Sequence, residues 1–326
     1  MRDGRSVRRR GWAFWGTAFL GTAAWAVQHG ANVLGAEAMV RQATHVYKVA
    51  GDAELTAHAF TPADAGRGES RPAVVMFHGG GWHRGGPEWC YPECRYFAAR
   101  GLVAIAIEYR LAGGEGTPLE SMADAKSAIR WVRAHAEELG VDPDRVAAGG
   151  CSSGGHLAAA AATLESFDEP REDAEISSVP NALLLWYPAV DVARDPWFAR
   201  LLGNGAEVAD CSPASNVRAG APPAIVFQGD ADDLTPIRGA KLFADEAAAA
   251  GNRCDLHIYP GRAHLFTDDP RDYADTMQRA DRFLVSLGFL EGEPDLAAIE
   301  ESRSERGAFG RRPGGRGPRA GGRGGP

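Results

Sequence analysis

Ser152 lies in a pattern that is typical of a catalytic nucleophile, with Gly150 two residues before it and Gly154 two residues after it. A short apolar run precedes the pattern, and residues 156–162, which are rich in alanine and favour helix, follow it. A serine on a sharp turn from strand to helix needs strained backbone, and side chains at the two flanking positions would clash there. Gly-x-Ser-x-Gly also occurs by chance, but in this context it predicts that Ser152 is a nucleophile.

A run of three glycines, residues 79–81, follows His78 and the apolar run at residues 72–77. Such glycines leave backbone N–H groups unshielded, and acyl transfer needs these donors because its tetrahedral intermediate carries negative charge on an oxygen. The alternative is a flexible turn with no role in catalysis. We expect the N–H groups of Gly79, Gly80 and Ser153 to form an oxyanion hole.

Apolar runs alternate with helical stretches along the middle of the chain, which predicts a single α/β domain with a mostly parallel central sheet and helices on both faces. A hairpin of residues 45–50 and 54–60 is expected at one edge of the sheet. Further strands are predicted near residues 73–78, 102–108, 145–149, 182–187, 223–228 and 255–259. Helices are predicted near residues 88–100, 119–138, 154–165, 236–250 and 270–287.

These motifs together resemble esterases and lipases of the α/β-hydrolase fold, close to the hormone-sensitive-lipase-like and bacterial feruloyl/acetyl-xylan-esterase-like groups. The resemblance covers roughly residues 45–288, and its motifs occur in the family's order. Two positions differ, because Cys151 stands where an acidic residue is common and Ser153 where alanine is frequent. The matching segments are residues 78–82, 108–111, 124–132, 150–158, 229–236 and 261–266.

A serine nucleophile needs a base, and the base needs an acid that orients it; in this fold the three follow in the order Ser, Asp or Glu, His. Asp230, Asp232 and Asp233 follow a predicted strand, and their position alone leaves all three open. The spacing of the family implies Asp232, with Asp230 bracing the turn. His264 lies in the loop after the next strand, from which it can reach Ser152.

The sequence thus predicts a serine carboxylic-ester hydrolase with the catalytic residues Ser152, Asp232 and His264. Residues 191–214 are too few for a large lid, so we expect an open cleft that accepts short or aromatic acyl esters, including esters of plant polysaccharide. Trp82 and His83 are candidate substrate contacts. Two alternatives are a serine exopeptidase of the prolyl-oligopeptidase type and a non-catalytic scaffold. A third hypothesis is that Cys151 is the nucleophile, but Cys151 lies one position away from the apex of the turn.

We expect no cofactor and no metal, since no clustered Cys and His residues have the spacing of a metal site. Residues 39–301 hold 23 of the 35 basic and 40 of the 43 acidic residues, a balance that argues against nucleic acid as a partner. The expected partner is a small-molecule or polysaccharide ester. An odd count of five cysteines leaves at least one free thiol.

Three segments are expected from composition. Residues 1–38 combine arginines, an apolar run and an A-x-A site, which is typical of an export signal. If this segment were retained it could anchor the chain in a membrane, and if translation began at Met39 the protein would be cytoplasmic. Residues 39–290 form the expected catalytic domain, and residues 291–326 a disordered tail rich in Gly, Arg and Pro.

Overall fold

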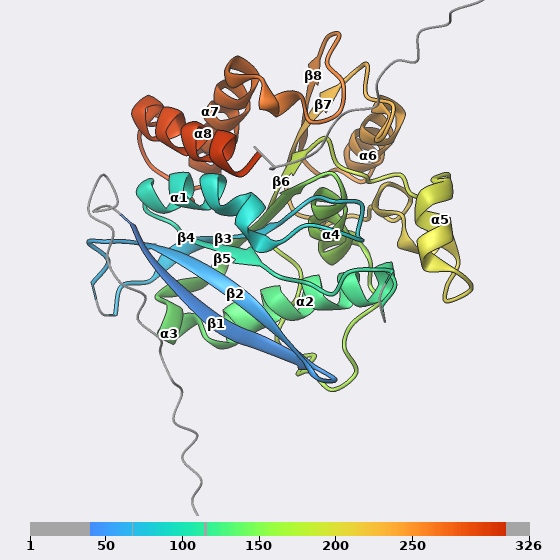
Figure 1. The fold of residues 1–326 in the computed structure, drawn as a ribbon, viewed down its shortest axis with the longest axis horizontal. Coiled ribbons are helices and arrows are strands. Elements are labelled where there is room, and N and C mark those ends of the chain that lie inside the picture. Colours follow the sequence, from blue (N-terminus) through green and yellow to red (C-terminus); the bar gives the residue numbers. More distant parts are fainter. Residues whose placement is uncertain (1–39, 67, 114–115, 311–326) are drawn as a thin grey trace, which may run out of the picture. The chain divides into compact units, whose positions relative to one another are not determined.

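The computed structural model describes residues 40–310 apart from residues 67 and 114–115 (Figure 1), so the predicted export signal lies outside the described residues. Eight strands form one sheet, in the spatial order β1-β2-β4-β3-β5-β6-β7-β8. The strands β1 and β2 form the predicted antiparallel hairpin, and β2 pairs with β4 in antiparallel fashion. All later neighbours are parallel. The strands are β1 Val40–Ala50, β2 Ala53–Pro62, β3 Arg71–Phe77, β4 Val103–Ile107, β5 Val141–Cys151, β6 Ala182–Trp186, β7 Ala224–Gly229 and β8 Cys254–Tyr259.

Helices cover both faces of this sheet, as predicted. One face packs against α2, α4 and α6, and the other packs against α1, α7 and α8. Successive side chains of β3 point to opposite faces of the sheet. Val75 and Phe77 pack in the core on the side of α2, α4 and α6, and Val74 and Met76 pack in the core on the side of α1, α7 and α8. The helices are α1 Tyr91–Ala99, α2 Pro118–Ala134, α3 Ala136–Leu139, α4 Ser153–Thr163, α5 Pro196–Leu202, α6 Ile237–Ala249, α7 Pro270–Ser286 and α8 Leu296–Gly310.

Strands β4 and β6 are buried along their whole length and carry almost only apolar side chains. Continuous apolar runs of this kind are characteristic of parallel strands that are covered on both faces. The order of the strands places the carboxyl ends of β5, β6, β7 and β8 next to one another at one edge. Side chains that follow these four ends can therefore meet.

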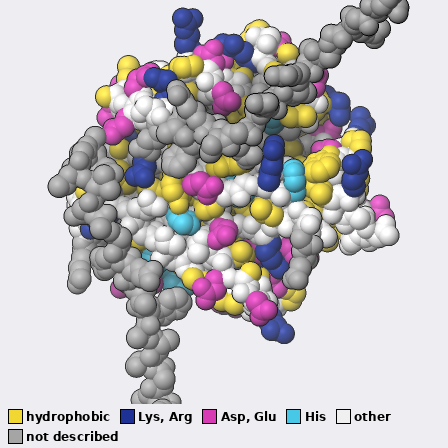
Figure 2. All heavy atoms as spheres, in the orientation of Figure 1, with side chains coloured by type: hydrophobic (Ala, Val, Ile, Leu, Met, Phe, Trp, Pro, Cys, Tyr) yellow, Lys and Arg dark blue, Asp and Glu magenta, His cyan; other side chains and the backbone are white. Residues whose placement is uncertain are grey.

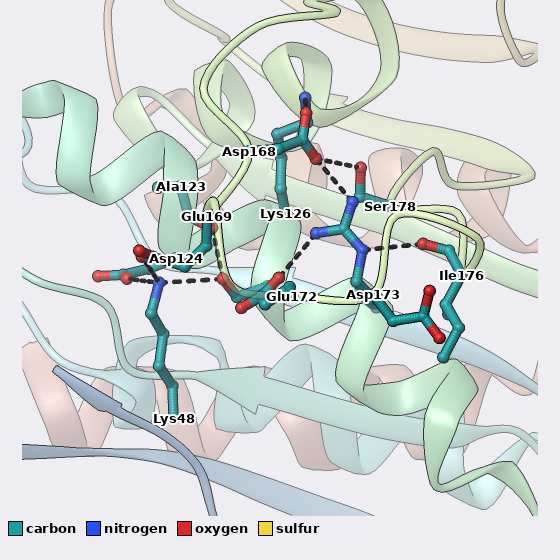
Figure 3. A network of polar contacts seen from close by, with 12 residues as sticks. Lys48, Ala123, Asp124, Lys126, Asp168, Glu169, Glu172, Asp173, Ile176 and Ser178 are labelled. Carbon is teal, nitrogen blue, oxygen red and sulfur yellow. Dashed lines mark hydrogen bonds and ion pairs between the residues drawn. The ribbon is translucent and has the colours of Figure 1, made fainter.

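The long segment between α4 and β6 is attached to α2 by ion pairs (Figure 3). Arg130 of α2 donates to Asp168 and Glu172, and Lys126 of the same helix pairs with Asp168. Lys48 of β1 joins Asp124 of α2 to Glu169, with 2.8 Å from its Nζ to a carboxylate oxygen of each. These contacts fix α2 to both the edge hairpin and the segment that precedes β6.

The predicted disordered tail begins too early, because residues 296–310 form helix α8. Ile299 and Ser302 are buried, and the hydroxyl groups of Ser302 and Tyr273 are 3.1 Å apart. The helix has few apolar residues, so its sequence pattern gives a weak signal, and packing against α1 and α7 stabilises it instead. Helix α5 and the 3-10 helices η3 Val208–Cys211 and η4 Pro213–Ser215 were likewise not predicted.

On the face drawn in Figure 2, acidic and basic side chains are intermixed, and hydrophobic side chains gather beside α5. Cys94, Cys211 and Cys254 form no disulfide bond. Among the described residues, no helix has the length and apolar character needed to cross a membrane. The same part of the chain contains no cluster of three or more His, Cys, Asp or Glu side chains placed to hold a metal ion.

Candidate active site

Ser152 lies on the predicted sharp turn between β5 and α4. Its backbone has φ 55° and ψ −119°, a conformation that non-glycine residues rarely adopt. Neighbouring backbone holds it there, since its N–H donates to the carbonyl of Trp186 at 3.0 Å and its carbonyl accepts from Ala189 at 3.1 Å. The side chain therefore stands at the carboxyl edge of the sheet.

The two flanking glycines are required by contact, as the sequence predicted. A Cβ added to Gly150 would lie 2.4 Å from the carbonyl oxygen of Phe77, and one added to Gly154 would lie 2.0 Å from the same oxygen. Both distances are far below van der Waals contact. Any larger side chain at either position would thus push β5 or α4 away from β3.

The structure brings together the three predicted catalytic side chains from the ends of β5, β7 and β8. His264 Nε2 lies 3.0 Å from Ser152 Oγ, and His264 Nδ1 lies 2.8 Å from Asp232 Oδ2. Because a carboxylate only accepts hydrogen bonds, the Nδ1 atom carries the proton and Nε2 is left to accept one from the serine. This is the tautomer that a general base needs.

Asp232 is buried and charged. Burial alone raises the pKa of its carboxyl group, but hydrogen bonds from the His264 ring and from the Thr235 backbone outweigh that effect and lower the pKa below its usual value. The carboxylate is therefore ready to orient the imidazole at neutral pH.

The other two aspartates of this loop do not contact the histidine. Asp230 Oδ1 accepts from the Gly261 N–H at 2.6 Å and so braces the turn after β8, as predicted. Asp233 is exposed. Position in the chain left these three residues open, and the contacts distinguish them.

The glycine run passes directly beside the serine. A Cβ on Gly79 would lie 3.5 Å from the Cβ of Ser152, and Gly80 has φ +128°, with no space for a side chain next to Arg84. Ser153 is the first residue of α4, where a backbone N–H has no acceptor within the helix. The expected donors Gly79, Gly80 and Ser153 thus lie on the two segments that flank Ser152.

The Ser153 side chain joins these two segments by a hydrogen bond that no sequence motif predicted. Its Oγ accepts from the N–H of Gly81 at 3.0 Å. The N–H group of Gly81 is therefore already hydrogen-bonded. This bond fixes the position of the glycine run relative to the start of α4. The one sequence feature that could have predicted this bond is the small polar residue, Ser153, directly after Ser152.

His78 is a buried, neutral histidine whose ring contacts the glycine run. Its ring stacks on Tyr109 at a centroid distance of 4.3 Å, and its Nδ1 lies 2.7 Å from the carbonyl oxygen of Gly79. Burial lowers the pKa of His78 to about 4. The Tyr109 hydroxyl donates to the His78 carbonyl at 2.8 Å, so this tyrosine also fixes the loop.

The prediction that Trp82 contacts substrate is wrong, because the residue belongs to the core. It is 2% exposed, its ring packs edge-on against Phe198, and its Nε1 donates to His156 Nδ1 at 3.2 Å. His156 in turn donates to the carbonyl of Cys211, and burial lowers its pKa to about 4. The motif placed Trp82 near the serine, but only the packing shows which way its ring points.

His83 remains a candidate substrate contact. It is exposed, and its ring meets that of Trp197 edge-on at 5.1 Å. Trp197, on α5, is 39% exposed and donates through Nε1 to the carbonyl of Gly81 at 3.3 Å. Helix α5 therefore borders the glycine run and supplies an aromatic surface beside it.

The sheet is mostly parallel with helices on both faces, and a serine lies on the strained turn after β5 with an aspartate–histidine pair beside it. These features define the α/β-hydrolase fold. Comparison with known proteins agrees. The chain belongs to the BD-FAE family of carboxylic ester hydrolases, because the model of that family matches residues 60–246. The family resemblance read from the sequence is thus confirmed.

Several solved and curated relatives are described as esterases. Esterase 2 of Thermogutta terrifontis is 42% identical, and the match covers 77% of this chain and 97% of that one with a TM-score of 0.74. Carboxylesterase NlhH of Mycobacterium tuberculosis is 31% identical, with 61% of this chain and 68% of NlhH covered. Probable carboxylic ester hydrolase LipM of the same organism is 31% identical, and there the match spans 54% of this chain but only 44% of LipM.

Proposed function

We propose that this chain hydrolyses esters of short acyl groups by two-step acyl transfer, with Ser152 as nucleophile, His264 as general base and acid, and Asp232 as the group that orients the imidazole. The observation that carries the proposal is the continuous hydrogen-bonded set from Ser152 Oγ through His264 to Asp232, at 3.0 and 2.8 Å.

In the first step, His264 Nε2 takes the proton of the Ser152 hydroxyl while Oγ attacks the ester carbonyl. The negative charge that develops on the carbonyl oxygen is stabilised by the backbone N–H groups of Gly79, Gly80 and Ser153; one such donor contributes roughly 2.7–4 kcal/mol. His264 then gives its proton to the leaving alcohol. Water repeats the sequence on the acyl-enzyme and releases the acid.

Three observations support a short acyl group. Structures of the Thermogutta terrifontis esterase are described as propionate bound and butyrate bound. Residues 191–214 form short helices whose side chains Phe198, Cys211 and Ala214 are buried in the core, an arrangement unlike a free lid over a long tunnel. Ser152 itself is partly exposed.

A series of p-nitrophenyl esters from acetate to laurate tests the acyl preference. We expect kcat/KM to be highest at two to four carbons, and a maximum at twelve or more carbons would refute the proposal. Acetylated xylan and methyl ferulate, assayed in parallel, test whether sugar acetates or aromatic acyl esters are the better substrates.

Covalent labelling tests the nucleophile. The Thermogutta terrifontis esterase is described as phosphorylated by paraoxon. We expect paraoxon to inactivate this enzyme and to add one diethyl phosphate group to the peptide that contains Ser152, read by mass spectrometry. Ser152→Ala should lose both hydrolysis and labelling, whereas labelling at Cys151 or an active Ser152→Ala variant would contradict the assignment.

A further inference from the structure

The Asp232 carboxylate receives more hydrogen bonds than its contact with His264. Oδ1 accepts from the backbone N–H groups of Leu234 and Thr235, both at 2.9 Å. Oδ2 accepts from His264, from the Thr235 hydroxyl at 2.8 Å and from the Gln228 amide at 3.2 Å. Five donors therefore surround a side chain that has no exposed surface. The sequence analysis assigned no role to two of the side chains that donate, Thr235 and Gln228.

The Thr235 hydroxyl lies at the junction of the carboxylate and the imidazole. Besides Asp232 Oδ2, its Oγ1 is 3.2 Å from His264 Nδ1 and 3.0 Å from the carbonyl oxygen of Tyr187. A hydroxyl has one proton and two lone pairs, so Oγ1 can donate to an oxygen on one side while it accepts from the imidazole on the other. The Nδ1 proton of His264 thus faces two oxygens instead of one, and the ring cannot turn without losing both.

The Gln228 side chain holds the same carboxylate from the end of β7. It is fully buried, and its Nε2 lies within 3.2 Å of three oxygens, namely the carbonyls of Gly229 and Thr235 and Asp232 Oδ2. Three acceptors around one atom require that atom to be the amide nitrogen. The Oε1 atom is buried and has no hydrogen-bond partner among the described residues. A buried polar atom without a partner is destabilising, so the amide is kept here at a cost to stability.

We propose that Thr235 and Gln228 are positioning residues for the hydrolytic reaction, acting through Asp232 and His264; this inference rests on the proposed function. When His264 takes the proton of Ser152, the Ser152 O–H bond breaks, an Nε2–H bond forms, and the imidazole becomes a cation. The Nδ1–H bond stays intact, and no proton moves to Asp232 or Thr235. The two residues keep the carboxylate and the ring aligned while this charge forms, because displacement of a reacting group by about 1 Å can cost roughly 100-fold in rate.

Kinetics of three threonine variants test this role. Thr235→Val removes the hydroxyl and keeps the shape, Thr235→Ser keeps the hydroxyl, and Thr276→Val is the matched control. Thr276 is a buried threonine on α7 whose hydroxyl donates to the carbonyl of Tyr273 at 3.0 Å. With p-nitrophenyl butyrate, and with active sites counted by a fluorophosphonate probe, we expect Thr235→Val to lower kcat roughly 10- to 100-fold at nearly constant KM. Thr235→Ser should stay within about threefold of the unmodified enzyme, and Thr276→Val should leave kcat unchanged.

A double-variant cycle separates positioning from a structural role. If Thr235 acts through the carboxylate, Thr235→Val added to Asp232→Asn should lower kcat by less than about threefold, because the interaction it supports is already lost. Gln228→Met, which removes the amide donor at similar volume, should behave like Thr235→Val in both backgrounds.

Any of three results would overturn the inference. The first is a Thr235→Val enzyme whose kcat is within twofold of the unmodified one, and the second is a Thr235→Ser enzyme as impaired as Thr235→Val. The third is a double variant whose loss of kcat equals the product of the losses caused by Thr235→Val and Asp232→Asn alone. If Thr235→Val does not fold, as judged by its unfolding midpoint, Thr235→Ala takes its place in the same cycle. Failure of the proposed function has a different signature, since the unmodified enzyme would then neither hydrolyse the ester nor be labelled at Ser152.

Discussion

Asp232→Asn is the most informative single substitution, because it keeps the size of the side chain and removes its charge. In the native site both carboxylate oxygens only accept hydrogen bonds, two from backbone N–H groups at Oδ1 and three from side chains at Oδ2. An amide must place its NH₂ group at one of these two positions, where it meets donors.

The surroundings decide which position the NH₂ group takes. At the Oδ1 position it would face the N–H groups of Leu234 and Thr235, which cannot turn. At the Oδ2 position it would face the Thr235 hydroxyl, which can rotate, and the His264 ring, which can move its proton. The third donor there, the Gln228 amide, is the most distant of the three at 3.2 Å and keeps the carbonyls of Gly229 and Thr235 as acceptors. The amide should therefore donate to His264 Nδ1, and the proton of the ring should shift to Nε2.

A proton on Nε2 points at Ser152 and prevents the histidine from acting as its base. In serine hydrolases such a change of tautomer lowers kcat on the order of 10⁴-fold. At 1.36 kcal/mol per factor of ten, this corresponds to about 5 kcal/mol of transition-state stabilisation. We expect a loss of this size with little change in KM or in the unfolding midpoint.

The assay is steady-state hydrolysis of p-nitrophenyl butyrate by Asp232→Asn, with Asp233→Asn as the exposed neighbour and Asp230→Asn as the turn brace. Both controls should keep kcat within a few-fold of the unmodified enzyme. An Asp232→Asn enzyme that retains a tenth or more of its activity, or an Asp230→Asn enzyme with the larger loss, would refute the assignment of the acid.

Three further predictions concern stability. Gly154→Ala should lower the free energy of unfolding by about 3 kcal/mol in urea titrations, because its Cβ would lie 2.0 Å from the Phe77 carbonyl oxygen; an unchanged midpoint would contradict the steric argument. Lys48→Met should cost about 1.5–3 kcal/mol, since it removes one charge-assisted contact from the fully buried Asp124 carboxylate, which keeps its ion pair with Arg110; a loss below 1 kcal/mol would show that the ion pair with Lys48 is dispensable. Burial lowers the pKa of His156 to about 4 in the fold, against about 6.5 in the unfolded chain, so the unfolded chain binds its proton first as the pH falls. This histidine should therefore lower the free energy of unfolding by up to about 3 kcal/mol between pH 6.5 and 4. His156→Gln should reduce the slope by that amount and leave the contribution of His78, whose pKa is also lowered to about 4.

Much of the fold could be read from the sequence because its signals are local. Apolar runs of strand length that alternate with helical stretches predict a parallel sheet between helices, and the strands and helices lie close to the predicted residues. Helix α8 shows the limit, since its place against α1 and α7 depends on contacts distant in sequence. Its own residues carry too little apolar pattern to reveal them.

By itself, the sequence predicted Ser152 as the nucleophile, the glycine run beside it and His264 as the base, because each depends on a short motif with a steric or chemical requirement that neighbouring residues display. The spacing of the family implied Asp232, but only the tertiary structure shows its contact with His264. Only the tertiary structure shows that the Trp82 ring packs in the core and that Thr235 and Gln228 contact the carboxylate. These outcomes depend on the directions of side chains where β7 and β8 end side by side. Hydrogen bonds and close packing between separate segments set those directions, and no local pattern records them.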